Sequence, residues 1–140
     1  MKKLTILSLA LVMILGSFSC NAQSNKKEET KNTVTTKVEV YYFHYTRRCV
    51  TCNAVETESK ASIAALYPAQ YKKGLITFKS VNLDEKGSEA LAAKCKAEGQ
   101  ALLIISGSKR TDLTDKGFMY AKSSPNKLKA ELKKAIDAIQ

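Results

Sequence analysis

Two cysteines spaced three residues apart, Cys49 and Cys52, are the side chains of this 140-residue sequence best suited to covalent chemistry. They enclose Val50 and Thr51 in a Cys-Val-Thr-Cys motif. On a helix, side chains three residues apart share one face, which brings two sulfurs within disulfide-bonding distance. The spacing therefore predicts a pair that interconverts between dithiol and disulfide.

The place of the motif in the chain predicts which sulfur reacts. A helical pattern starts at Cys49, so this sulfur would stand where unpaired amides and the helix dipole stabilise a thiolate. Arg47 and Arg48 add positive charge beside it, which should push the reduction potential in the oxidising direction. Because the thiolate is the reactive form, we expect Cys49 to attack and Cys52, one turn further on, to resolve the mixed disulfide.

Two other roles remain open for the same pair. It could be a permanent structural disulfide, or part of a site for a soft metal, because thiolates suit Cu(I), Zn or As(III). A tetrahedral zinc site needs about four ligands, and only Cys95 and His44 remain to offer them. Cys95 falls at an inner helical position and is predicted to be a buried thiol. His44 is predicted to be packed and hydrogen-bonded at a strand end, with proton transfer as the alternative role, so we assign no metal and no cofactor.

Alternating strands and helices must position these residues. The predicted strands span residues 37–45, 75–83 and 101–106, with a further edge strand at 117–120, and the predicted helices span 49–67, 85–98 and 124–139. Pro68 should end the first helix, Gly99 should cap the C-terminus of the second, and Ser124-Pro125 should start the third. The order β-α-β-α-β-β-α predicts an α/β domain with a four-stranded mixed sheet and helices on both faces.

Four stretches of this sequence together resemble the thioredoxin-like superfamily. They are KVEVYYFHY (37–45), RCVTC (48–52), VNLDE (81–85) and LAAKC (91–95). The first two are similar to a branch named after a nitroreductase subunit of arsenic operons. The resemblance covers about residues 37–139, and it implies a thioredoxin-like fold that exchanges disulfides with a protein partner through Cys49 and Cys52.

Three departures from the family pattern keep metal binding open. Thioredoxins usually carry Gly-Pro between the two cysteines, where this chain has Val50 and Thr51. They carry a buried Asp, the proton acceptor for the resolving thiol, where this chain is expected to have Phe43. They also carry a cis-proline before the third strand, which helps bind partner peptides and keeps metals off the cysteines, where this chain is expected to have Ala101.

The first residues are typical of an export signal. Met1-Lys2-Lys3 precedes an apolar run of about a dozen residues, too short to span a membrane, and small residues lead to Cys20. The segment resembles a bacterial lipobox, which implies a signal peptide over 1–19 and a lipidated Cys20; ordinary cleavage after Ala22 is the alternative. Residues 20–36 are predicted to be a flexible tether and residues 37–140 the domain. We expect a protein lipid-anchored to a bacterial membrane, facing periplasm or cell surface.

The excess of basic residues does not indicate a nucleic-acid partner. Lys and Arg number 23 against 13 Asp and Glu, a net charge of +10, but the positive charges are scattered and no nucleic-acid motif accompanies them. The sequence thus predicts an envelope thiol-disulfide oxidoreductase with a protein partner. The alternatives are a thiolate module that binds Cu(I) or As(III), and a redox-inactive docking scaffold.

Overall fold

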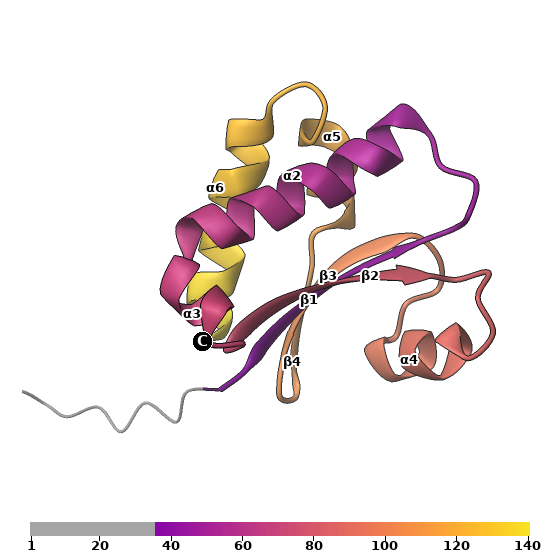
Figure 1. Cartoon of the computed structure of the whole chain (residues 1–140), viewed down its shortest axis with the longest axis horizontal. Coiled ribbons are helices and arrows are strands. Elements are labelled where there is room, and N and C mark those ends of the chain that lie inside the picture. Colours follow the sequence, from indigo (N-terminus) through magenta and orange to yellow (C-terminus); the bar gives the residue numbers. More distant parts are fainter. Residues whose placement is uncertain (1–35) are drawn as a thin grey trace, which may run out of the picture. The chain divides into compact units, whose positions relative to one another are not determined.

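Four strands and five helices fill residues 36–140, the part of the chain that the computed structural model describes (Figure 1). The strands are β1 (Val38–His44), β2 (Ile76–Asn82), β3 (Ala101–Ser106) and β4 (Lys109–Asp112). The helices are α2 (Val50–Leu66), α3 (Pro68–Lys72), α4 (Ser88–Cys95), α5 (Thr114–Tyr120) and α6 (Pro125–Ile139). The predicted signal peptide, Cys20 and all of the predicted tether except Thr36 lie outside these residues. No helix within them is long and apolar enough to cross a bilayer.

The four strands form one mixed sheet in the order β2-β1-β3-β4. β1 pairs with β2 in parallel, whereas β3 runs antiparallel to both β1 and β4. A parallel pair needs a crossover connection, and α2 with α3 supplies it between β1 and β2. The predicted α/β class and four-stranded mixed sheet are confirmed.

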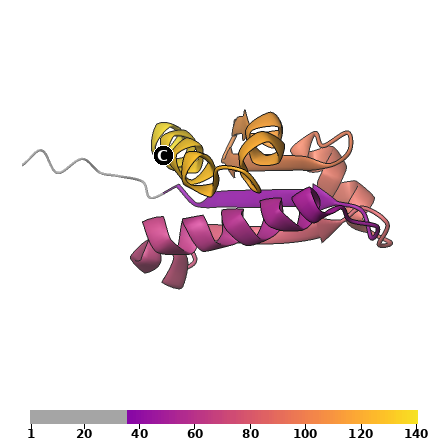
Figure 2. The same cartoon turned by 90° about the horizontal axis from the view of Figure 1, so that it is seen from above.

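The sheet separates two hydrophobic cores because side chains of β1 alternate between its faces. Val40 and Tyr42 pack into the larger core, which α2, α5 and α6 cover, and Figure 2 shows α2 and α6 side by side along the sheet. Tyr41 and Phe43 pack into the smaller core under α4, on the opposite face. The prediction of helices on both faces is confirmed.

The predicted edge strand at 117–120 is wrong, because these residues belong to helix α5. Just before this helix, Asp112 Oδ1 accepts hydrogen bonds from the N–H of Thr114 at 3.0 Å and from its hydroxyl at 2.6 Å, and Thr114 is the first residue of α5. Gly117 lets the helix approach the sheet closely, since a Cβ there would lie 3.2 Å from Leu102 Cδ2 and 3.4 Å from Val55 Cγ1. The fourth strand is instead β4, whose mostly exposed polar side chains carry no apolar alternation.

One predicted helix end is wrong, and two others are as predicted but differ in detail. α4 is shorter than predicted: its C-cap residue is Lys96, which takes a left-handed conformation with φ of 54°, and not Gly99. Pro68 ends α2 as expected but is itself the first residue of α3. Pro125 begins α6 as predicted, whereas the Ser124 side chain makes no capping hydrogen bond.

Candidate redox site

Cys49 and Cys52 form a disulfide at the start of α2, with their Cα atoms 5.0 Å apart. Cys49 is the N-cap residue, with extended backbone angles, and its Sγ accepts a hydrogen bond from the Cys52 N–H at 3.1 Å. The structure therefore places Cys49 at the helix N-terminus, where the sequence predicted it.

The two sulfurs differ in exposure. Cys49 is exposed, whereas Cys52 is only 5% exposed and faces the interior. The first turn of α2 contains no acidic residue that would offset the helix dipole at this end. Cys49 is therefore open to other molecules, whereas Cys52 is shielded from them.

The sheet register brings a second segment to the same edge as the disulfide. Ala101 pairs with Phe43, so β3 starts beside the end of β1, where the chain turns into the loop before Cys49. Tyr45 in that loop is 42% exposed, and its hydroxyl lies 3.7 Å from where a Cβ on Gly99 would be. The segment that leads into β3 thus lies against the loop that carries the disulfide.

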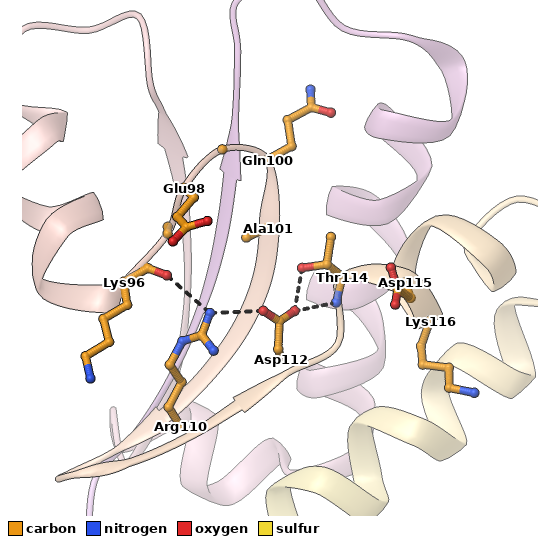
Figure 3. Close-up of a pocket in the computed structure, with 11 residues that line it drawn as sticks. Lys96, Glu98, Gln100, Ala101, Arg110, Asp112, Thr114, Asp115 and Lys116 are labelled. Atoms are coloured by element: carbon orange, nitrogen blue, oxygen red, sulfur yellow. Dashed lines mark hydrogen bonds and ion pairs between the residues drawn. The ribbon is translucent and has the colours of Figure 1, made fainter.

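A groove of about 780 Å³ extends beside Ala101, between the end of α4 and the start of α5 (Figure 3). Within it the Arg110 guanidinium donates to the Cys95 carbonyl oxygen at 3.1 Å and to Asp112 at 2.9 Å. Burial acts to raise the pKa of Asp112, but hydrogen bonds from Thr114 and the charge of Arg110 hold it below its ordinary value. The groove therefore has mixed charge, and its arginine is already paired.

Arg48 does not lie free beside the disulfide, as its position in the sequence suggested. Its guanidinium forms an ion pair with Glu56 and donates from Nε to His44 Nδ1 at 3.0 Å. Burial acts to raise the pKa of Glu56, but hydrogen bonds from Arg48 and Ser80 hold it below its ordinary value. The charge of Arg48 is consequently balanced by a carboxylate, whereas Arg47 is exposed.

His44 is a buried polar side chain at the end of β1, on the α2 side of the sheet. It is 4% exposed, its ring centroid lies 5.6 Å from that of Tyr42, and Nδ1 lies 3.0 Å from the Tyr45 carbonyl oxygen. Phe43, which the sequence analysis expected to stand where thioredoxins carry a buried Asp, points to the opposite face under α4. His44 is thus packed and hydrogen-bonded as predicted. Among the ionisable residues of β1, it is the last one in the sequence before α2.

Cys95 belongs to the core on the face of the sheet opposite to α2. It is buried in the smaller core, and burial raises the pKa of its thiol. Across residues 36–140, no group of three or more His, Cys, Asp or Glu side chains is arranged to hold a metal ion. The prediction that Cys95 is a buried thiol is confirmed.

Glu56 is the residue of this site that the sequence analysis missed. Its spacing of four from Cys52 places it one turn further along α2, near the same face, which was the available signal.

No protein-family model matches the chain, and a search of curated proteins finds no match. The function must therefore be argued from the site itself.

Proposed function

We propose that this chain is a thiol-disulfide oxidoreductase that exchanges the Cys49–Cys52 disulfide with a partner protein. The observation that carries the proposal is the pairing of an exposed sulfur at a helix N-terminus with a buried sulfur one turn away. The exposed position admits a partner, and the helix end stabilises the thiolate that must attack or leave. The buried position keeps the second sulfur for the resolving step.

The reaction takes place in two exchanges. The Cys49 thiolate attacks one sulfur of a partner disulfide, forming a mixed disulfide and releasing the other partner sulfur as a thiolate. The Cys52 thiol then loses its proton and attacks the Cys49 sulfur, which forms the Cys49–Cys52 bond and releases the second partner thiolate. The partner gains two electrons and the cysteine pair loses two. The reverse sequence oxidises a partner dithiol.

Fold and location belong to the same proposal. The mixed sheet, with the cysteine pair on the helix that follows β1, supports a thioredoxin-like fold. The basic start, apolar run and Cys20 support export and a lipid anchor on a bacterial membrane. The partner would then be a protein of the bacterial envelope, where disulfides persist.

Trapping the mixed disulfide tests the proposal. Cys52→Ser leaves the attacking sulfur without its resolving partner, so the variant should accumulate a stable adduct with a peptide disulfide. Cys49→Ser should form no adduct, and Cys95→Ser should behave as the unmodified chain because that thiol is buried. Adducts formed equally by Cys49→Ser, or none formed by Cys52→Ser, would overturn the assignment.

A soft-metal thiolate site is the second candidate, because one exposed and one buried sulfur lie together without a third protein ligand within residues 36–140. Two thiolates suit Cu(I) or, with an added external thiol, As(III). This candidate requires the reduced chain to bind one equivalent tightly and Cys52→Ser to lose that binding. The remaining alternative, a redox-inactive docking scaffold, requires the Cys49→Ser variant to retain the function of the wild-type protein.

A further inference from the structure

Two oppositely charged residues flank the cysteine pair along the chain. Arg48 directly precedes Cys49, and Glu56 lies one helical turn beyond Cys52. Their side chains form an ion pair and are only 23% and 27% exposed. Charges that are partly buried are screened less by salt than exposed ones, so the field of this pair extends further than that of a surface pair.

Hydrogen bonds from neighbouring elements hold the ion pair in place. Arg48 Nε donates to His44 Nδ1 at the end of β1, and Ser80 on β2 contributes to holding the pKa of Glu56 below its ordinary value. The other ionisable group that faces the pair is the buried phenol of Tyr42. The guanidinium is thus held by the end of β1 and by α2, in its ion pair with Glu56.

The sign of each charge determines its effect on the reduced protein. Reduction adds two electrons to the disulfide, and Cys49 then carries a negative charge whenever the pH exceeds its pKa. A free Arg48 cation would stabilise that thiolate and make the pair a stronger oxidant. Glu56 opposes this effect twice, because it neutralises Arg48 and because its own negative charge lies one turn from Cys52.

We infer that Glu56 sets the reduction potential of the Cys49–Cys52 pair by holding and neutralising Arg48. This inference rests on the proposed thiol-disulfide exchange and adds a positioning residue to it. With the charge of Arg48 balanced by Glu56, the groups that stabilise the Cys49 thiolate are the helix N-terminus and the Cys52 N–H. The pair is therefore a weaker oxidant than its two arginines would make it.

The test compares the equilibrium of the full chain with glutathione across four proteins: wild type, Glu56→Gln, Arg48→Gln and Glu58→Gln. Glu56→Gln should favour the dithiol about fivefold over wild type, which for a two-electron couple is roughly 20 mV. Arg48→Gln should favour the disulfide. Glu58→Gln, the same substitution two residues further along α2, should leave the equilibrium unchanged.

The opposite directions of the two effects separate an electrostatic role from a structural one. If the ion pair only supported the fold, both substitutions would shift the glutathione equilibrium in the same direction. They would also lower the melting temperature without changing the pH profile of Cys49 alkylation. We expect Glu56→Gln to shift that profile to lower pH and Arg48→Gln to higher pH. If the glutathione equilibrium is the same in both variants as in wild type, the inference is overturned but the proposed oxidoreductase function stands. If the wild-type chain does not exchange with glutathione at all, the proposed function is overturned.

Discussion

The backbone N–H of Cys52 donates a hydrogen bond to the Sγ of Cys49 at 3.1 Å. An N–H in the first turn of a helix has no partner within the helix, so the sulfur takes the place that a Ser or Asp oxygen commonly fills. In the proposed exchange the same N–H would face the Cys49 thiolate, and hydrogen bonds to ionised acceptors are the stronger kind. Under that proposal, the cap of α2 is also the group that stabilises the attacking sulfur.

The first prediction concerns the pKa of Cys49. In a Cys20→Ser/Cys52→Ser chain, the rate of iodoacetamide alkylation at Cys49 should report a pKa below about 8.5, the value for an unperturbed thiol. The physical reason is the combined effect of the helix dipole and the Cys52-position N–H on the thiolate. The same chain unfolded in urea should return to the unperturbed value, and a folded-state pKa at or above it would contradict the argument.

The second prediction concerns Cys95. Because burial raises the pKa of this thiol, its alkylation at pH 8 in the folded, reduced chain should be at least about 100-fold slower than that of Cys49. Mass spectrometry of peptides after timed alkylation measures both rates in one sample. Comparable rates at the two cysteines would show that the smaller core opens readily, which the packing of α4 on the sheet argues against.

The sequence was informative where a single local signal determines the structure. Cys49 and Cys52 mark the start of α2 because their spacing and the apolar face beyond them agree. It was less informative about Arg48. Because Arg48 directly precedes Cys49, the sequence suggested that its charge lies beside that sulfur, but in the structure Arg48 pairs with Glu56, eight residues away. Side-chain direction depends on which groups the fold brings close, and here β1 brings His44 under the arginine.

The third prediction tests why a glycine stands within α5. Gly117→Ala should lower the free energy of unfolding by about 1–2 kcal/mol, because the added methyl group crowds Leu102 and Val55, both fully buried. Chemical denaturation measures the change. The matched control is Gly99→Ala, where the nearest atom is 3.7 Å away and the effect should stay within about 0.5 kcal/mol. A stabilised Gly117→Ala chain would show that helix propensity outweighs the crowding.

The same glycine explains the one wrong strand. Residues 117–120 combine a glycine with three bulky side chains, which locally is typical of a strand edge, and only the close approach to Leu102 reveals the need for a helix. β4 was missed for the opposite reason, because an exposed edge strand can be polar on both faces. Both features depend on contacts with β3, which the sequence of the segment itself does not contain.

The fourth prediction concerns acid sensitivity at Asp112. Its folded-state pKa is below the ordinary value, so its contribution to stability is present above about pH 4 and is lost as the pH falls through the folded-state pKa. Asp112→Asn should cost about 1 kcal/mol at pH 7, since the carboxylate is partly exposed and screened. Urea denaturation at pH 7 and pH 3 should show this difference shrinking in acid.

The matched control for Asp112 is the next acidic residue in the chain. Asp115→Asn changes a carboxylate in the first turn of α5 and should alter the unfolding free energy by less than about 0.5 kcal/mol. An Asp112→Asn effect that is the same at both pH values would show that the hydrogen bonds to Thr114, and not the charge, carry the stabilisation.

Equilibration of the chain in a series of glutathione redox buffers, with alkylation and mass spectrometry to count the Cys49–Cys52 disulfide, tests the central claim most directly. We predict one reversible two-electron transition at a potential above about −300 mV, within reach of a disulfide-exchange partner. A disulfide that stays intact in buffers poised below that potential would identify it as a structural cross-link and would contradict the redox function.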